Sequence, residues 1–365
     1  MLKDSEIAAR RLTAQQIAHP AFATPCGLVA WLGAVQAQDY AAVKWAMGLR
    51  LAGDTTDASV ERVINEGAVL RAHALRGTWQ LVAPADIRWM LELVAPRLIA
   101  SYATRYRELG LDAVTFRRSK AALAKALRGG AQLTRAELAS ALEAAGISTA
   151  GQRLAHLLQR AELEALICGG ARCHKQFTYA LLDDRAPHSH PRLERDEALA
   201  ELARRYFRSR GPATVADFKW WSGLAPADAR AGLDAVRSEL ASSVVDGRVF
   251  WHSNDAAARA RSPAAFLLPA FDEYLIAYRD RDAVLDPKHV KRLNAGGGML
   301  GTCVVVDGRV IGTWRRTLAR ATVAIGLDLF EAPVPRARQA ITAAAQLYGA
   351  FLGLETSVAI TGGHR

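Results

Sequence analysis

The sequence has little cysteine: its 365 residues include only Cys26, Cys168, Cys173 and Cys303. Because these four are few and scattered, we expect no disulfide framework. Cys168, Cys173 and His174 lie close together, but their spacing is not one of the strong zinc patterns and no second ligand pair follows. We therefore expect no metal site and no other cofactor.

Long apolar runs are also missing. No uninterrupted apolar segment is long enough to span a bilayer. The first residues, "MLKDSEIAARRL", are charged and amphipathic and lack the apolar centre of a signal peptide. Hydrophobic residues nevertheless make up 51% of the chain, which excludes an intrinsically disordered protein. These features predict a cytoplasmic globular protein that is long enough for two or three compact units.

Positive charge is in excess. Lys and Arg number 47 against 36 Asp and Glu, and the formal net charge is +11. Such an excess favours an anionic partner, either nucleic acid or an anionic membrane surface. A soluble basic enzyme would show the same balance, so charge alone leaves both interpretations open.

A pattern of two or three short helices followed by a hairpin recurs three times. The clearest copy, within 129–192, is "QLTRAELASALEAAG", with Thr134 and Glu137 in capping-box spacing, then "STAGQRLAHLLQRAELE" and two β-prone runs in "ALICGGARCHKQFTYALL". A copy within 193–262 ends in the hairpin "SSVVDGRVFWHS", and a looser copy lies within 1–128. Helix, helix and hairpin are the outline of a winged helix, a variant of the helix-turn-helix.

The sequence pattern changes from mainly helical to strand-like after about Pro263. The segments "AAFLLPAFDEYLIAYRDRDAVLD", "GTCVVVDGRVIGTWRR" and "ATVAIGLDLF" are strand-like, and "PRARQAITAAAQLYGAFLG" predicts a final helix. We therefore predict an α+β fold with three tandem winged-helix units and a β-rich C-terminal part at 263–365. A purely structural helical array is the alternative, because helix-turn-helix outlines arise by chance in alanine-rich chains.

No glycine-rich phosphate loop and no nucleophile elbow is present. The hairpin "RAHALRGTWQLV" carries Arg71, His73, Arg76 and Thr78, which suit a surface that grips phosphates. The alternative is a solvated wing with a packed Trp79.

Two basic segments near the C-terminus are further candidates for DNA contact. "DGRVIGTWRR" carries Trp314, Arg315 and Arg316, a basic hairpin with an aromatic ring that suits a DNA groove, although an edge strand protected by arginine would look similar. "DPKHVKRLNAGGG" is a basic loop that would lie near phosphate, or a plain surface loop, and its cationic residues are Lys288, Lys291 and Arg292.

Asp272 and Glu273 in "LLPAFDEYLIAYRDR" are carboxylates among apolar residues. They could serve as an acid or a base, but we expect a helix cap or ion pairs.

The stretch "VQAQD" sets Gln36 and Gln38 two residues apart beside an apolar run. Together with "LRGTWQL", "LLPAFDEYLIAYRDR" and "VVVDGRVIGTWRR", it resembles the winged-helix DNA glycosylases of the azinomycin-resistance and interstrand-crosslink-unhooking type. The resemblance covers essentially the whole chain, and the order of the motifs agrees. Where many relatives have His after the Trp of "GTW", this chain has Gln80, so a role of that histidine is not transferred.

The resemblance implies a C-shaped molecule around a DNA channel and a monofunctional glycosylase that removes N7-alkylated purines, including bulky adducts and crosslinks. It makes Gln36 and Gln38 the catalytic pair, whose carbonyls would hold the attacking water. In a helix, residues two apart point about 200° away from each other, so both can reach one water only if the helix ends near Val35. The alternative is that the glutamines cap a helix end.

The expected partner is double-stranded DNA with alkylated purines, and a monomer would suffice. A DNA-binding regulator without catalysis is the main alternative, since winged helices often serve that role. An architectural or RNA-binding protein would fit the charge but leaves the glutamines unexplained.

Overall fold

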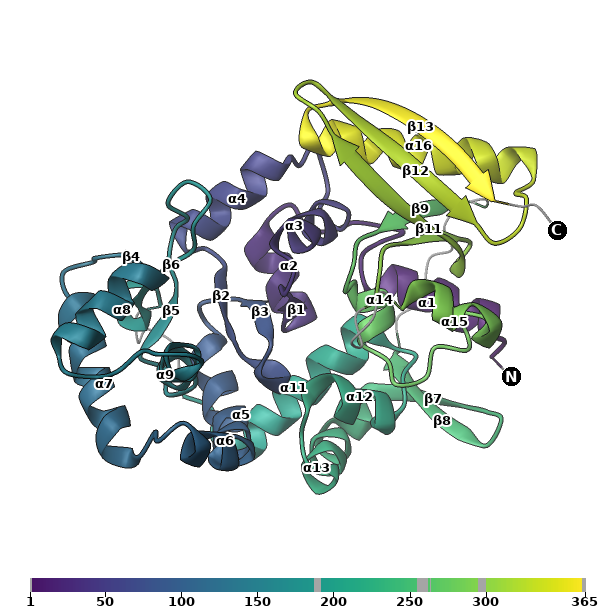
Figure 1. Ribbon diagram of the computed structural model, residues 1–365. Coiled ribbons are helices and arrows are strands. Elements are labelled where there is room, and N and C mark those ends of the chain that lie inside the picture. The colour runs from purple at the N-terminus through teal and green to yellow at the C-terminus, as the bar shows by residue number, and fades with distance from the viewer. Residues whose placement is uncertain (1, 187–191, 255–261, 263, 295–299, 363–365) are drawn as a thin grey trace. The chain divides into compact units, whose positions relative to one another are not determined.

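A computed structural model of the chain describes residues 2–186, 192–254, 262, 264–294 and 300–362 (Figure 1). Its contacts form two compact units. The first unit comprises Met1–Leu32, Gln36–Glu61 and Ala200–Arg365, and the second comprises Gly33–Val35 and Arg62–Leu199. Both units mix helices and strands, so the expected α+β class is confirmed. The division into four parts is finer than this and stays a prediction.

The first unit is built from both ends of the chain. Its helices, of which α4 and α11 continue into the second unit, are α1 (Asp4–Ala14), α2 (Pro25–Leu32), α3 (Tyr40–Gly48), α4 (Asp57–Glu66), α11 (Arg195–Arg210), α12 (Val215–Ser222), α13 (Pro226–Val236), α14 (Glu273–Ile276), α15 (Val290–Leu293) and α16 (Pro335–Leu352). Short 3₁₀ turns, η2 (Arg237–Glu239) and η3 (Pro287–His289), complete it.

A five-stranded sheet forms the C-terminal part of this unit. Its strands are β9 (Ala265–Leu268), β10 (Cys303–Val306), β11 (Arg309–Leu318), β12 (Thr322–Leu329) and β13 (Glu355–Gly362), in the order β13-β12-β11-β10-β9. Neighbours are antiparallel except β12 and β13, which are parallel and are joined through α16. Figure 1 shows α16 along this sheet, and it contacts β9, β10, β12 and β13.

Parts of this region differ from the sequence prediction. Only the beginning of "AAFLLPAFDEYLIAYRDRDAVLD" is a strand, because Asp272 accepts a hydrogen bond from the Tyr274 amide and starts α14. The final helix is followed by β13, which the sequence did not indicate. The hairpin turn at Asp307 and Gly308 has positive φ angles of 46° and 84°, the conformation that this residue pair favours.

The second unit holds the middle of the chain. Its elements are β2 (Leu70–His73), η1 (Leu75–Gly77), β3 (Trp79–Val82), α5 (Ile87–Ser101), α6 (Ala103–Glu108), α7 (Ala113–Ala126), β4 (Leu133–Thr134), α8 (Arg135–Ala144), α9 (Arg153–Leu163), β5 (Ile167–Gly169), β6 (Thr178–Leu181) and α10 (Leu182–Arg185). The capping box expected at Thr134 and Glu137 is present at the start of α8.

One order of elements recurs along the chain: a helix, a short extended segment, two helices and a hairpin. In the middle copy these are α7, β4, α8, α9, β5 and β6, and the sheet order is β4-β6-β5. In the first copy, β1 (Val35–Gln36) lies between α2 and α3 in the chain. The sheet order is β1-β3-β2, so here too the short strand pairs with the last strand of the hairpin.

The third copy has α11, α12 and α13, followed by the hairpin of β7 (Leu240–Val245) and β8 (Arg248–Ser253). A bridge from Ala213 to Trp251 of β8 takes the place of the short strand. In all three copies, the segment before the second helix pairs with the last strand of the hairpin.

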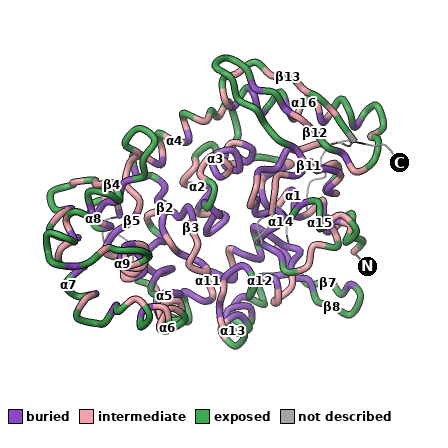
Figure 2. Tube along the Cα trace, in the orientation of Figure 1, coloured by how far each residue is buried: buried purple, intermediate pink, exposed green. Residues whose placement is uncertain are grey.

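Each unit has its own apolar core. Figure 2 shows buried positions along the inner stretches of both units and exposed ones at loops and outer helix faces. In the second unit, α7, α8 and α9 contribute Leu123, Leu138 and Leu157 to one cluster. Among the described helices, none combines the length and the apolar character needed to cross a membrane.

Candidate active site around the glutamine pair

The glutamine pair lies where the chain leaves a helix. Helix α2 ends at Leu32, Gly33 follows with a positive φ of 74°, and Val35 and Gln36 are extended as β1. Gln36 is buried and Gln38 is exposed, with the fully buried Ala37 between them. The helix therefore ends before the pair, which is one requirement for both side chains to reach a shared water.

The backbone at Gln36 is fixed by a buried carboxylate. The Gln36 amide donates to Oε1 of Glu273 at 2.9 Å, and Oε2 of Glu273 accepts from the indole of Trp221 at 3.0 Å. The guanidinium of Arg210 donates to the same Oε2 at 2.7 Å and 3.1 Å. Glu273 and Arg210 are 1% and 0% exposed, so solvent screens this pair very little.

Arg210 also holds the other end of the turn. Its Nη1 donates to the carbonyl of Leu32, the last residue of α2, at 2.6 Å. Its guanidinium lies 4.3 Å from the centre of the Trp221 ring, which sets its orientation. The Arg210–Glu273 ion pair thus contacts the chain at Leu32 and at Gln36, on both sides of the turn that precedes the glutamines.

A second buried ion pair supports the same region. Arg50 forms two hydrogen bonds to Asp272, at 2.7 Å and 2.9 Å, and a third to Gln15 at 3.1 Å. Asp272 and Glu273 therefore form ion pairs, and Asp272 caps α14, as expected from the sequence.

Helix α3 begins directly after the pair. Asp39 caps it by accepting a hydrogen bond from the Ala42 amide at 2.9 Å. Further along α3, the indole of Trp45 donates to the Leu267 carbonyl of β9 at 2.7 Å, and its ring meets Tyr348 of α16 at 5.0 Å. The glutamines are thus followed by a helix that is anchored on the C-terminal sheet.

The first basic hairpin belongs to the second unit. Arg71 is buried and His73 is partly buried, with Nδ1 of His73 2.5 Å from the fully buried Glu162. Arg76 has a positive φ of 57° in the turn, and Thr78 is partly buried. His73 is thus engaged by Glu162 within this unit, whereas Arg71 lines a cleft that is described below.

The C-terminal basic residues lie in the first unit. Lys288 and Lys291 are exposed, and Arg292 pairs with Asp328 at 2.8 Å. The three glycines that follow, 296–298, lie outside the described residues.

The structure corrects the expectation for Trp314. Its side chain is only 6% exposed, its indole donates to the Leu268 carbonyl at 2.7 Å, and its ring packs on Tyr348. The ring therefore belongs to the core and is not available to enter a groove. Arg315 and Arg316 follow on the exposed end of β11, opposite Gly326 and Ile325 of β12.

Several polar residues around these sites were not singled out from the sequence. Arg210 and Trp221 lie in ordinary amphipathic helices, and no local signal marks them as neighbours of Glu273. Arg320, which is exposed in the turn between β11 and β12, had only its charge to indicate it. Among the described residues, no group of three or more His, Cys, Asp or Glu side chains is arranged to hold a metal ion.

Comparison with known proteins decides the family. The family model described as "DNA glycosylase AlkZ-like" matches residues 29–351, a span that begins before the glutamine pair and ends within α16. The chain belongs to the AlkZ-like DNA glycosylase family. The resemblance seen in the sequence is thereby confirmed, and so is the expectation of a glycosylase enzyme.

A sequence match and a solved structure, both from Streptomyces sahachiroi, extend this result. The chain is 27% identical over 310 residues to an interstrand DNA cross-link repair glycosylase, covering 79% of this chain and 81% of the relative. It is also similar to the solved structure of the DNA glycosylase AlkZ, with a TM-score of 0.82, 23% identity and coverage of 99% of this chain and 100% of the other. At that identity, the second likeness shows the fold.

Proposed function

We propose that this glycosylase hydrolyses the N-glycosidic bond of purines alkylated at N7 in duplex DNA. The observation that carries the proposal is the backbone of Gln36, which is tied to buried Glu273 at a point where the chain has left α2. An ion pair of this kind, away from solvent, keeps a catalytic segment in one conformation without itself taking part in the reaction. Gln36 and Gln38 are the proposed catalytic residues.

Cleavage of this glycosidic bond needs little help from a general acid. A guanine alkylated at N7 carries a positive charge, so the base is already an activated leaving group. As the bond breaks, the sugar develops oxocarbenium character, and the enzyme has to place a water and stabilise the spreading positive charge. No strong general acid is required for that step.

Two amides suit this task. Each glutamine offers a carbonyl oxygen that can accept a hydrogen from the water, with the negative end of its dipole toward the developing cation. A neutral pair also avoids the cost of unpaired carboxylates beside buried residues such as Ala37. The two carboxylates nearby, Asp272 and Glu273, are already neutralised by Arg50 and Arg210.

The proposed DNA contacts are basic side chains of both units. Arg71, Arg76 and Thr78 would contact the backbone from the first hairpin, and His73 would contribute by orienting that hairpin through Glu162. From the first unit, the proposed contacts are Lys288, Lys291, Arg292, Arg315 and Arg316. Phosphate contacts of this kind position the duplex and carry no sequence information.

We also propose that the three copies of helix, extended segment, two helices and hairpin are winged helices. The shared sheet order of the first two copies supports this, since a winged helix pairs the short strand with the last strand of its wing. The C-shaped arrangement around a DNA channel stays a prediction.

For the substrate, we propose bulky natural-product adducts and interstrand crosslinks as well as simple alkylpurines. The support is the cross-link repair relative, which matches 79% of the chain. A role in base excision repair and in self-resistance to a DNA-alkylating antibiotic follows from the same proposal. We propose that the enzyme acts as a monomer.

The test is release of free 7-methylguanine from a methylated duplex by the wild-type protein, separated from DNA by chromatography. Release with intact strands after mild handling is expected. Borohydride should trap no covalent complex, because the proposed mechanism uses water and no lysine nucleophile. Binding without release from either methylated or bulky adducts would leave a DNA-binding protein without this catalysis.

A further inference from the structure

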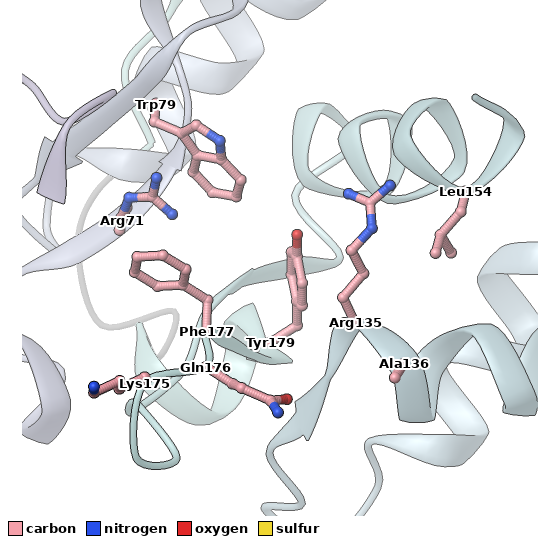
Figure 3. A pocket seen from close by; sticks show the side chains of 9 residues that line it. All are labelled: Arg71, Trp79, Arg135, Ala136, Leu154, Lys175, Gln176, Phe177 and Tyr179. Carbon is pink, nitrogen blue, oxygen red and sulfur yellow. The ribbon is translucent and has the colours of Figure 1, made fainter. Parts of the chain in front are cut away.

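A cleft in the second unit joins aromatic and cationic side chains (Figure 3). Its volume is about 630 Å³, within the range of about 300–1,000 Å³ that is common for small-ligand sites. The side chains that line it are Arg71, Trp79, Arg135, Ala136, Leu154, Lys175, Gln176, Phe177 and Tyr179. They come from the first hairpin, the start of α8, the helix α9 and the segment at β6.

The aromatic side is arranged in a stack. Figure 3 shows the Arg71 side chain beside the rings of Trp79 and Phe177. Its guanidinium lies 3.9 Å from the centre of the Trp79 ring and 4.4 Å from that of Phe177. Phe177 is 38% exposed, so one ring of the stack is open to a ligand. Burial, together with the negative charge of Glu162, raises the pKa of Tyr179 well above its ordinary value, so its hydroxyl stays neutral and can donate.

The cationic side suits an anion. Arg135 and Lys175 are exposed at the cleft, and Arg135 stands in the first turn of α8, where the helix dipole adds positive potential. Of the described residues that line the cleft, none is acidic. Rings that present a flat face beside cations are the combination with which proteins bind unpaired nucleotides.

We propose that this cleft binds one unpaired nucleotide of a DNA strand. The base stacks on Phe177, the exposed ring of the cleft, and the phosphate contacts Arg135 and Lys175. This inference rests on the proposed action on DNA, but it assigns a site that is separate from the glutamine pair. It gives the enzyme a preference for duplexes in which a nucleotide has left the helical stack.

The experiment compares two undamaged duplexes, one fully paired and one with a single bulged thymidine, so that turnover plays no part. The wild type should bind the bulged duplex more tightly in fluorescence anisotropy. Phe177→Leu keeps an apolar side chain but removes the ring, and it should lower that preference about tenfold, the size typical of base–aromatic stacking. Arg135→Ala should lower it as well.

The matched control is Arg117→Ala, which removes one charge from an exposed position of the same unit that does not line the cleft. It should leave the preference for the bulge unchanged. Lys175→Ala, in the same loop as Phe177, provides a second cleft variant, and thermal unfolding of each variant checks that it folds.

The outcomes separate the two proposals. One contrary result is that the wild type binds both duplexes equally, and another is that the preference for the bulge persists in Phe177→Leu and Arg135→Ala. Either result overturns the proposal that the cleft binds an unpaired nucleotide and leaves the glycosylase proposal intact. Binding of neither duplex contradicts the DNA function itself. A third arm adds free thymidine monophosphate: if it competes at the concentration at which the bulged duplex binds, the cleft is a site for free nucleotides and not for a strand.

Discussion

The two glutamines occupy different surroundings. Gln36 is 8% exposed, and its amide is tied to Glu273, whereas Gln38 is exposed one residue before the cap of α3. This difference suggests a division of labour in which Gln36 is the fixed member and Gln38 faces the solvent side from which a water can arrive. We propose that the position of Gln36 then depends on the Arg210–Glu273 ion pair.

The substitution Glu273→Gln tests that dependence. It removes the charge that pairs with the fully buried Arg210, so we expect the free energy of unfolding to fall by about 3–5 kcal/mol, the usual cost of an uncompensated buried charge. Base release by the protein that remains folded should slow as well, because the ion pair that holds the chain at Leu32 and Gln36 is lost. Denaturant titration measures the first effect and single-turnover assays the second.

Glu331→Gln is the matched control. Glu331 is 81% exposed and lies 3.7 Å from Lys288, so the same change of charge should alter the free energy of unfolding by less than about 0.5 kcal/mol. A Glu273→Gln variant as stable and as active as this control would show that the buried pair does not organise the site.

At the scale of elements, the sequence predicts turns and helix caps, which depend on nearby residues, but not the pairing of strands that are distant in the chain. The turn at Asp246 and Gly247 and the capping box at Thr134 depend on residues next to each other, and both are present. The sequence did not predict β13 because this strand is mostly exposed or half-buried. Its partner, β12, is separated from it in the chain by the whole of α16. Nothing within the strand itself reveals a partner so far away in sequence.

The packing of α3 on α16 gives a second prediction. A Cβ at Gly48 would lie 2.4 Å from the Phe351 ring, so Gly48→Ala should overpack this contact. Overpacking costs about 1–3 kcal/mol, which outweighs the gain of up to about 1 kcal/mol in helix propensity. The free energy of unfolding should therefore fall.

A double variant isolates the cause. Phe351→Leu makes room beside Gly48, so Gly48→Ala should cost less in that background, as a non-additive pair of neighbours. If the cost of Gly48→Ala is the same in both backgrounds, the contact with Phe351 is not its origin. Thermal and denaturant unfolding of the four proteins gives the comparison.

The hairpin of β11 and β12 gives a prediction on binding. Arg315→Ala with Arg316→Ala should weaken binding to any duplex and lower the slope of log K against log salt by about 2, close to one unit for each lost phosphate contact. The control pair, Arg336→Ala with Arg338→Ala on α16, removes the same charge from exposed positions. Identical slopes in both double variants would exclude a specific role of the hairpin.

At the scale of the whole molecule, the sequence led to the family through the order of its motifs. It predicted the α+β class, and it made a shared water conditional on a helix that ends near Val35; α2 ends at Leu32. It could not reveal the partners of Glu273, because Arg210 and Trp221 come from helices more than fifty residues away. It also could not reveal the cleft, whose lining residues come from four separate segments.

Trp314 is a second side chain whose surroundings the sequence did not predict. Its place among arginines in "GTWRR" suggested an aromatic ring offered to DNA, yet strand alternation turns it to the core while Arg315 stays exposed. Which face of a hairpin is covered is decided by α16, and that packing is not local information. The sequence predicts that the hairpin is basic, but it does not predict which face of the hairpin is buried.

The most direct test of the account is the rate of 7-methylguanine release by a Gln36→Ala, Gln38→Ala double variant under single-turnover conditions. A fall of at least about 100-fold is expected, with DNA binding and thermal unfolding close to the wild type, because the lost groups place the water and stabilise the transition state. Gln346→Ala, at an exposed glutamine of α16, should release base at the wild-type rate. Release by the double variant at the wild-type rate would contradict the account, because the glutamine pair would then not be the catalytic centre.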